Sequence, residues 1–505
     1  MRTKKAIYNI LFSIVYQIVS ILCGLILPRL ILSAFGSTYN GVISSATQFL
    51  SMISLLNIGI AGATRVALYK TLANNDKLGT SRIMKATSKY MHKVGICVIV
   101  YALVLSIIYP YISHNNLSYI ENSMLIIIIS IATFAEYFFG LSNSTLIWAD
   151  QRGYIISIVN IVSTIMNTIL SAILIVFGQS IFMVKLVSSC VFLVAPLILQ
   201  IYVNKKYQLI KECVPDYGAI KGRGAVAFHS VANIIHNNTD LLILTLFTDA
   251  KEISVYTVYY LVVGKIKSVM NAFTSGLEAA FGNMWAKGEY DTLKNRFEIL
   301  EYVLYSFTMI IFSCVGVLLV PFVQIYTIGV TDTNYILPTL AMLITLAEGM
   351  YCIREPYLIL VQATGNYEAT KFGALCEAVL NIIVSVVLVS FIGINGVIIG
   401  TFVANFFRTT QFSIFVYRNI LHKRFIKYWL RFFWLIISSG IIIITSMIAI
   451  GSLPEYAGWA GWLLKSIITF FIASIITVSS SFIVYKSELV SFSKLIIQMI
   501  NIKNR

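Results

Sequence analysis

The sequence predicts an all-α polytopic membrane protein with fourteen transmembrane helices, in two parallel six-helix repeats followed by an extra C-terminal helix pair. Three observations predict this class. The chain of 505 residues is 58% hydrophobic and 11% charged, with a mean hydropathy of +0.85, whereas a soluble domain is about half apolar and a quarter charged. Apolar runs of about 20 residues, long enough to cross a ~30 Å hydrocarbon core, recur from end to end. Segments in the first and second halves of the chain are also near copies of one another.

The first apolar run follows a short basic segment, as it would in a signal peptide. It continues past Pro28 without a small-residue cleavage site, so we expect it to be the first span. After the last span, residues 486–505 alternate apolar and polar side chains at helical spacing, which predicts an amphipathic helix on the cytoplasmic face. The fourteen spans are expected at residues 8–34, 40–69, 94–112, 122–148, 153–177, 180–204, 223–248, 253–283, 299–328, 335–362, 370–392, 395–418, 430–451 and 462–485.

The lysines and arginines divide unevenly between the two sides of these spans. With the N-terminus in the cytoplasm, twenty-eight of them fall in cytoplasmic segments, and Lys251 alone falls in an external loop. This positive-inside bias predicts that the N- and C-termini are both cytoplasmic. It also explains the net charge of +16 through contact with anionic lipid headgroups, so the charge does not indicate a nucleic-acid partner.

The loops and the cysteines argue against several classes of function. The external loops are too short to hold a catalytic domain, so we do not expect an enzyme. The motif GxxxxGK[ST] is missing from the sequence, which argues against ATP-driven transport within this chain. The seven cysteines show no CxxC or paired spacing, so the sequence predicts neither a disulfide framework nor a metal site, and it indicates no bound cofactor.

A duplication organises the chain. "LILSAFG" at 30–36 is nearly repeated as "LILTLFT" at 242–248, and "GIAGATRVALYKTLANNDKL" corresponds to "GLEAAFGNMWAKGEYDTL". Six spans separate the copies, an even number, so both run in the same direction, as in parallel repeats about an axis along the membrane normal. We predict the substrate site between the repeats. The predicted parts are an N-lobe at 1–208, a linker at 209–222, a C-lobe at 223–420, a helix pair at 421–485 and a tail at 486–505.

Polar stripes indicate which spans line a wet cavity. A lining helix shows polar residues at three-to-four-residue spacing, and such stripes fall on spans 1, 2, 4 and 5 and again on spans 7, 8, 10 and 11. The stripe on span 7 ends at Asp240, and the stripe on span 8 includes Lys267. Serine and threonine stripes also mediate helix packing. A charge that faces lipid costs several kcal/mol, so the charged residues favour a cavity.

The segments "LPRLILSAFGSTYNGVISSATQFLSMISLLNIGIAGATR", "NNTDLLILTLF" and "VYTVYYLV…GLEAAFGNMWAKGEYD" carry a resemblance that spans essentially the whole chain. In their order and spacing they resemble the multidrug/oligosaccharidyl-lipid/polysaccharide (MOP) flippase superfamily, most closely its O-antigen (Wzx-type) branch. The resemblance implies a V-shaped, two-lobe transporter that works by alternating access. It also implies a cargo, a polyprenyl-diphosphate-linked oligosaccharide carried across the bacterial cytoplasmic membrane for surface-polysaccharide or lipopolysaccharide biosynthesis. Membrane lipids and the polysaccharide polymerase machinery would be its partners.

An anionic diphosphate in a low-dielectric cavity requires cations, which arginine supplies bidentately and lysine as a point charge. The candidates are Arg29, Arg65, Lys267 and Lys265; the resemblance implies cations in spans 1, 2 and 8, which these residues match. Lys265 lies about 200° round the helix from Lys267, and the polar stripe favours Lys267. The alternatives are that Arg65 extends its side chain to the cytoplasm and that Arg29 pairs with a carbonyl near Pro28.

The glycan and a coupling ion would use other side chains. Neutral hydrogen-bonding groups and rings suited to sugars are Asn160, Asn167, Tyr256, Tyr260, Asn271 and Asn381. A buried carboxylate must pair, protonate or bind a cation. Acids that could couple transport to a Na⁺ or H⁺ gradient are Asp240, Glu278, Glu136 and Glu377. The alternative is a structural ion pair, for example between Asp240 or Glu278 and a lysine of span 8.

Three other functions fit part of the pattern. A drug/cation antiporter of the same superfamily would use the membrane acids, although the cations of spans 1, 2 and 8 would repel its substrate. A peptidoglycan-precursor or teichoic-acid flippase would differ only in cargo. A membrane enzyme such as a glycan polymerase would be expected to carry a long external loop, which the sequence lacks.

Overall fold

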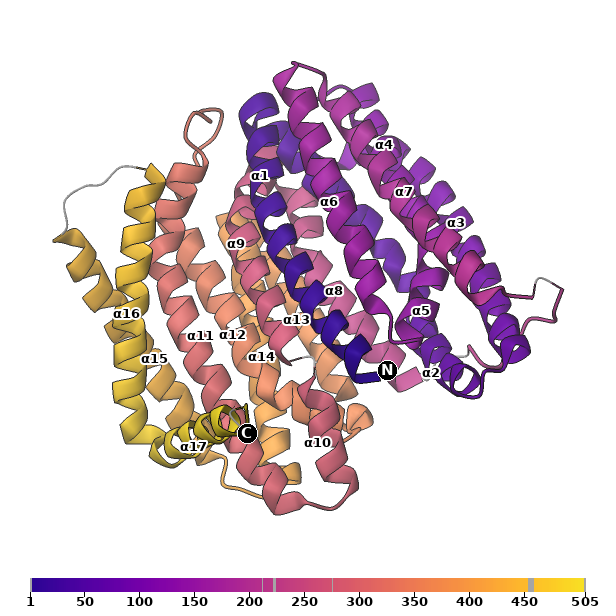
Figure 1. Ribbon diagram of the computed structural model, residues 1–505. Helices are drawn as coiled ribbons and strands as arrows, with labels where there is room; N and C mark the ends of the chain where they lie inside the picture. The colour runs from indigo at the N-terminus through magenta and orange to yellow at the C-terminus, as the bar shows by residue number, and fades with distance from the viewer. Residues whose placement is uncertain (1, 211, 221–223, 275, 453–457, 504–505) are drawn as a thin grey trace. The chain divides into compact units, whose positions relative to one another are not determined.

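The computed structural model describes residues 2–210, 212–220, 224–274, 276–452 and 458–503. Within its helices, the side chains of residues 2–4, 6, 224–230, 232, 233, 236, 237, 272 and 495–503 lie outside the description. The described residues are helical apart from turns and one isolated β-bridge between His114 and Asp249 (Figure 1). The prediction of an all-α protein is confirmed for this part of the chain.

Contacts divide the chain into two compact units. Unit 1 comprises Met1–Thr257 and Gly329–Thr333, and unit 2 comprises Val258–Ile328 and Asn334–Arg505. Helix α9 (Ala250–Thr274) begins in unit 1 and ends in unit 2. The other elements of unit 1 are α1 (Arg2–Ser51), η1 (Met52–Asn57), α2 (Ile60–Ala73), α3 (Lys77–Ile112), α4 (Tyr119–Ala135), η2 (Glu136–Gly140), α5 (Leu141–Ala149), α6 (Gly153–Val176), α7 (Ile181–Tyr207) and α8 (Gly224–Phe247).

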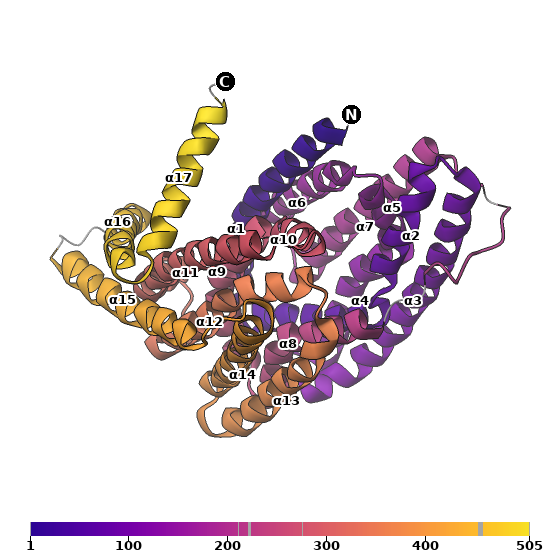
Figure 2. The same ribbon diagram turned by 90° about the horizontal axis from the view of Figure 1, so that it is seen from below.

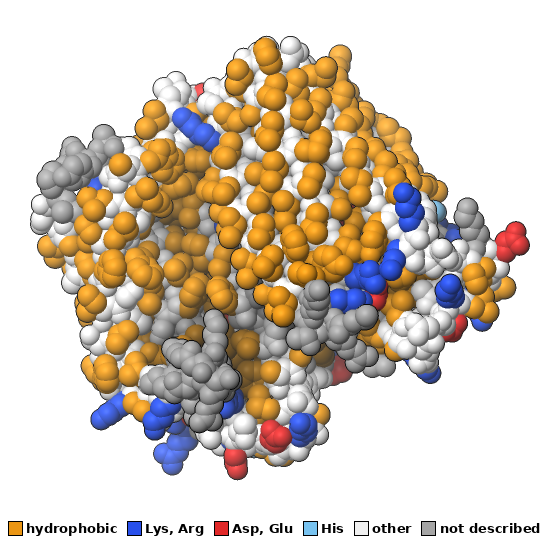
Figure 3. Space-filling model, viewed as in Figure 1, with side chains coloured by type: hydrophobic (Ala, Val, Ile, Leu, Met, Phe, Trp, Pro, Cys, Tyr) orange, Lys and Arg blue, Asp and Glu red, His pale blue; other side chains and the backbone are white. Residues whose placement is uncertain are grey.

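The elements of unit 1 pack with α6 along α1, α3 along α4, and α7 against both α4 and α6. Apolar side chains cover the face over α1 and α6, and lysines and arginines gather at the end of the unit near the chain's start (Figure 3). Buried apolar side chains form one core between α3, α5, α6 and α7 and another between α1, α3 and α4. The exposed apolar face fits a lipid environment, where such a surface needs no covering.

Unit 2 continues from α9 into nine further elements. These are α10 (Leu277–Ala286), α11 (Tyr290–Tyr326), α12 (Pro338–Ala363), α13 (Tyr367–Ile392), α14 (Ile394–Phe415), η3 (Val416–Ile420), α15 (Ile426–Gly451), α16 (Gly458–Val484) and α17 (Lys486–Lys503). The closest helix packing is between α13 and α14 and between α12 and α14. The segment predicted as an amphipathic tail forms helix α17, which runs across the end of α16 (Figure 2).

Nine helical segments of the described chain are long and apolar enough to cross a membrane. They contain ten of the predicted spans, because the segment Ile7–Asn57 holds the first and most of the second. The other four predicted spans are helical too, as α8, α9, α12 and α14. The chain is therefore a multi-pass membrane protein, while the count of fourteen spans and the orientation of the termini stay predictions.

Two long helices extend beyond the spans predicted from apolar runs. Helix α3 starts at Lys77, where the Asp76 side chain caps it by accepting from the Gly79 amide, although the apolar run starts only at residue 94. Helix α11 likewise starts at Tyr290, ahead of the predicted 299. Hydropathy detects only the part of a helix that matches lipid, so it misses the polar first turns of these two helices.

The backbone breaks near the points that the duplication pairs. Helix α1 kinks at Gly36 (φ 81°), and α8 ends at Phe247, so both copies of the repeated apolar motif end in a turn. The second spans are also interrupted: Gly59 (φ 77°) precedes α2, and Gly276 precedes α10. Gly59 and Gly276 are the first residues of the two corresponding segments named above. The single helices predicted at 40–69 and 253–283 are thus each divided in two.

The compact units differ from the predicted lobes. Helix α8 packs against α1 and η1, so it clusters with unit 1 although it lies after the predicted linker. Residues 329–333 join unit 1, where Asp332 accepts hydrogen bonds from the Ser37 amide (2.8 Å) and hydroxyl (2.6 Å). A division by contacts does not test a duplication, and the predicted lobes stay a prediction.

Candidate functional site

The predicted cation Lys267 forms an ion pair inside unit 2. Its Nζ lies 2.7 Å from Oε2 of Glu348 on α12, and the two side chains are 9% and 6% exposed. The ammonium also donates to the Tyr260 hydroxyl at 3.3 Å. Two side chains that the sequence predicts to serve cargo, Lys267 and Tyr260, therefore meet here. The structural alternative from the sequence pairs a lysine of span 8 with Asp240 or Glu278, whereas the carboxylate beside Lys267 belongs to span 10.

Two arginines and a second glutamate extend this ion pair across unit 2. Nη1 of Arg354 lies 2.6 Å from Oε1 of Glu377, and Nε of Arg408 lies 3.3 Å from its Oε2. The Tyr351 ring joins the two pairs, with Lys267 4.0 Å and Arg354 4.4 Å from its centroid. All of these charged side chains are buried. Breaking a buried pair leaves an uncompensated charge, so this network favours a structural role for Glu377 over its predicted role in ion coupling.

The predicted sugar ligand Asn381 lies in the contact between α13 and α14. It is fully buried on α13, and its amide donates to the Thr401 hydroxyl of α14 at 3.0 Å. The adjacent Ser385 donates to the Val397 carbonyl at 3.1 Å, and Gly400 lets α14 approach Ser385 so closely that a Cβ would lie 2.0 Å from its Oγ. The polar stripe on span 11 therefore joins α13 to α14.

The two predicted arginines of unit 1 are half-buried. Arg29 lies in α1 just after Pro28, inside a helix that continues to the kink at Gly36. Arg65 lies in the first turns of α2, and its Nε is buried with no hydrogen-bond partner among the described residues. In a membrane, an interrupted helix is tolerated where its backbone is buried in protein or lines a water-filled cavity. The break at Gly59 thus places Arg65 at a kind of position that membrane proteins use for polar ligands.

The acid Glu136 occupies an irregular turn of unit 1. The π-helical residues Glu136–Gly140 divide α4 from α5, and such turns are frequent at functional sites. Gly140 permits close packing on α7, where a Cβ would lie 3.3 Å from Pro196. The Glu136 side chain is exposed on the surface of the protein.

Of the predicted sugar ligands on α6, Asn167 is buried and Asn160 is half-buried. The Asn167 Oδ1 accepts from the Ser171 hydroxyl at 3.4 Å. Both residues lie on the helix that packs along α1, which carries Arg29. The sugar ligands and the arginine that the sequence predicts for one cargo thus come from neighbouring helices of unit 1.

The acid Asp240 is buried in α8 and accepts from the Tyr256 hydroxyl at 3.0 Å. Tyr256, predicted as a sugar ligand, is itself buried. The side chains of His229, Asn233 and His236, which precede Asp240 on the predicted polar face, lie outside the described residues. Of these four residues, the structure therefore describes the side chain of Asp240 alone, which accepts a hydrogen bond from Tyr256.

Helix α1 contacts α8 and the start of α9 through polar pairs. The hydroxyls of Ser45 and Thr245 are 2.6 Å apart, and Asn40 donates to Ser254 at 2.7 Å. Gly41 makes the approach possible, because a Cβ there would lie 1.7 Å from the Ala250 carbonyl oxygen. The part of α1 that follows its kink is therefore held against the turn between α8 and α9.

The remaining predicted residues are more open. Lys265 is half-buried, and Asn271 and Glu278 are exposed. Glu278 lies in the first turn of α10, directly after the break at Gly276. Because none of these three side chains is buried, they are not part of the buried charge network of unit 2.

A second buried network in unit 2 is not predicted from the sequence. Glu301 of α11 is fully buried and accepts from Tyr357, Tyr417 and Arg431. Arg431 also pairs with Glu488 of α17, so the network connects α11, α12, η3, α15 and α17. An acid inside the apolar run "FEILEYVLY" is the signal that could have revealed it.

Comparison with known proteins shows the fold. No protein-family model and no curated protein sequence matches the chain. A structure of "Lipid II flippase MurJ, inward closed conformation" matches with a TM-score of 0.70 and 14% identity, over 95% of this chain and 100% of that chain.

Multidrug transporters match as well. An outward-facing multidrug resistance MATE family transporter of the MOP superfamily gives a TM-score of 0.59 at 11% identity, over 83% of this chain and 96% of that chain. A MATE structure in the bent conformation gives 0.53 at 13% identity, over 83% of this chain and 95% of that chain. The chain therefore shares the fold of these solved structures. The Wzx-type branch of that superfamily stays a prediction.

Proposed function

We propose that the chain is a flippase that carries a polyprenyl-diphosphate-linked oligosaccharide across the bacterial cytoplasmic membrane by alternating access. The observation that carries this proposal is Arg65, a half-buried arginine soon after a break in a membrane helix, whose Nε is buried and unpartnered among the described residues. A guanidinium in such surroundings can bind a pair of phosphate oxygens bidentately. The MOP-type fold and the multi-pass architecture support the proposal.

In this mechanism, Arg29 and Arg65 hold the diphosphate, and Asn160 and Asn167 contact the sugars. The polyprenyl tail stays in lipid, so the cavity has to receive only the polar part of the cargo. Lys267 is held by Glu348, so we assign it to the stability of unit 2. With the termini in the cytoplasm, the polymerase machinery would receive the delivered glycan on the external side.

Coupling to an ion gradient would use Glu136 or Asp240. Glu136 is exposed on a π-helical turn, and Asp240 is buried and accepts from Tyr256 at 3.0 Å. Binding a proton or Na⁺ at either carboxylate would remove a charge from the membrane interior, which lowers the cost of moving the empty carrier. An Asp240→Asn variant that kept full transport and full sensitivity to both gradients would exclude Asp240 from coupling.

The test of the cargo sites is complementation of a strain that lacks its own flippase, with surface glycan as the readout. Arg65→Ala and Arg29→Ala should reduce delivery at least tenfold at equal protein level, while Arg65→Lys should retain part of it because the positive charge remains. Arg296→Ala removes an exposed arginine of α11 and serves as the matched control. If both alanine variants complement fully, the proposed cationic site is wrong.

A second candidate cargo is a peptidoglycan precursor. It is favoured by the likeness to a protein named as a lipid II flippase, which covers 95% of this chain. A drug or cation substrate is less favoured, because Arg29 and Arg65 would repel it. Complementation of strains that lack either a surface-glycan flippase or a lipid II flippase separates the first two cargoes, and efflux of cationic dyes tests the third.

A further inference from the structure

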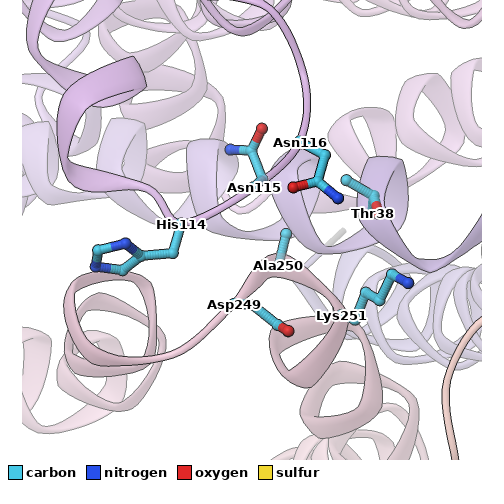
Figure 4. Close-up of a pocket in the computed structure, with 7 residues that line it drawn as sticks. All are labelled: Thr38, His114, Asn115, Asn116, Asp249, Ala250 and Lys251. Carbon is cyan, nitrogen blue, oxygen red and sulfur yellow. The ribbon is translucent and has the colours of Figure 1, made fainter.

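A polar pocket lies in unit 1, where the kink of α1 meets two other turns. Its cavity of about 260 Å³ is lined by Thr38, His114, Asn115, Asn116, Asp249, Ala250 and Lys251 (Figure 4). Thr38 follows the kink at Gly36, and residues 114–116 join α3 to α4. Residues 249–251 form the turn into α9. All three turns are predicted to face the outside of the cell, and none of the lining residues belongs to the cargo site described above.

The frame of the pocket is fixed by hydrogen bonds within and between its turns. The Ala250 amide donates to the His114 carbonyl at 3.1 Å, and the His114 ring lies 3.3 Å from the Leu246 carbonyl oxygen. Asn115 donates to Ser113 and to Asn122 and accepts from the Leu117 amide, so its side chain is used to hold the turn. The pocket is therefore largely preformed, as small-molecule sites usually are.

Several polar groups remain available inside this frame. Among the described residues, the structure gives Thr38 and Asn116 no side-chain hydrogen-bond partner. Asp249 uses Oδ1 to accept from the Glu252 amide at 2.8 Å, which leaves Oδ2. Lys251 donates one proton to the Asp332 carbonyl at 2.9 Å and has two more. A hydroxyl, an amide, a carboxylate and an ammonium are thus among the groups of the residues that line the cavity (Figure 4).

The charges of the pocket indicate a neutral ligand. Lys251 and Asp249 balance each other, and the carboxylate of Asp332 nearby is already bound by Ser37. Lys251 is also the single lysine or arginine that the predicted orientation leaves in an external loop. A cation kept where the positive-inside bias excludes it needs a local reason, and a ligand with acceptor oxygens supplies one.

We propose that this pocket binds one sugar residue, a neutral hexose or N-acetylhexosamine, on the external side of the membrane. The mixed donors and acceptors match the hydroxyls of a sugar ring, each of which donates and accepts. The cavity is smaller than the roughly 300–1,000 Å³ of a drug-sized ligand site, so it has room for one ring, and the other rings of a longer glycan would lie outside it. The inference rests on the proposed function, because the sugar would be part of the glycan that the chain delivers.

The binding test uses the full-length protein purified in detergent and four free sugars, namely glucose, galactose, N-acetylglucosamine and N-acetylgalactosamine. Saturation-transfer NMR should detect binding of at least one sugar at millimolar concentration. Asn116→Ala and Thr38→Val should each weaken that binding at least fivefold. Gln179→Ala is the matched control, because Gln179 is an exposed amide in another predicted external turn.

Surface-glycan complementation then distinguishes a sugar of the cargo from a free sugar. If the pocket serves the cargo, Asn116→Ala lowers glycan delivery along with sugar binding, and the control changes neither. The inference is overturned if none of the four sugars binds, if both pocket variants bind as the wild type does, or if binding is lost while delivery is unchanged. The proposed function fails separately, when Arg29→Ala and Arg65→Ala deliver glycan normally.

Discussion

The pair of Lys267 and Glu348 allows a sharp test of whether a membrane cation serves the cargo or the fold. Lys267→Met leaves the Glu348 carboxylate buried and unpaired, and Glu348→Leu leaves the ammonium unpaired. Replacing both residues removes both charges and fills a similar volume. Because the two charged atoms are 2.7 Å apart and both side chains are buried, solvent screens the pair weakly.

Breaking a buried pair by removing one partner costs about 3–5 kcal/mol, whereas an apolar replacement of both is close to neutral. For a unit of roughly 250 residues, each kcal/mol shifts the melting temperature by about 2 °C, so each single variant should melt roughly 6–10 °C lower. The double variant Lys267→Met/Glu348→Leu should melt within about 3 °C of the wild type by the same conversion. The coupling between the two sites would then equal most of the single effects.

The assay is thermal unfolding of the detergent-solubilised protein, followed by size-exclusion chromatography, with surface-glycan complementation measured for the same four proteins. We expect the double variant to regain at least half of the wild-type delivery, since we assign Lys267 to the stability of unit 2. A single variant as stable as the wild type would refute the buried-pair reasoning. A double variant that is stable but inactive would instead indicate that Lys267 binds the cargo.

Three further predictions concern other parts of the chain. Glu301→Gln removes the fully buried carboxylate that Arg431 shares with two tyrosines, while Arg431 keeps Glu488, so it should lower stability by about 1–3 kcal/mol in the same thermal assay. Glu289→Gln, at an exposed position, should be neutral, and equal stability of the two variants would contradict this role. Gly41→Ala places a Cβ 1.7 Å from the Ala250 carbonyl oxygen and should separate α1 from α9, so a disulfide between Asn40→Cys and Ser254→Cys should form more slowly; an unchanged rate would argue against the close approach. Partial burial opposes ionisation of Asp150, yet hydrogen bonds from Tyr207 and Lys5 and the charge of Arg152 hold the pKa of Asp150 below its ordinary value. The stabilising contribution of Asp150 is therefore complete above about pH 4 and is lost as the pH falls through that lower pKa. Asp150→Asn should increase hydrogen exchange in the first turns of α1 at neutral pH, because Lys5 loses its ion pair. Equal exchange rates in the variant and the wild type would show that this ion pair does not hold the start of α1.

Much of the fold could be predicted from the sequence, because the lipid environment imposes a simple pattern. Apolar runs locate the helices, and the gap between the first two predicted spans contains the kink at Gly36. The interruptions at Gly59 and Gly276 are not predicted, since a hydropathy pattern records which residues are apolar but not the direction of the backbone.

The sequence predicts which charged residues of the candidate site lie inside the membrane, but it does not predict which residues they pair with. The sequence singles out Lys267 and Glu377 as charges inside the membrane, but their partners Glu348, Arg354 and Arg408 come from other helices. The external pocket is not predictable in the same way, because its residues come from three short turns, each of which is ordinary by itself. No single segment of the sequence indicates that these three turns meet in the folded chain.

The Glu301 network has a consequence for how the chain enters the membrane during synthesis. Arg431 follows Glu301 by 130 residues, so α11 emerges from the ribosome long before its cationic partner is translated. Until α15 arrives, the carboxyl can have the hydroxyls of Tyr357 and Tyr417 as partners but not the arginine, and a carboxylate without a cation is disfavoured in lipid. We therefore expect α11 to reach its final stability only when α15 is made, so a chain that stops before residue 431 should be degraded faster than the full-length chain.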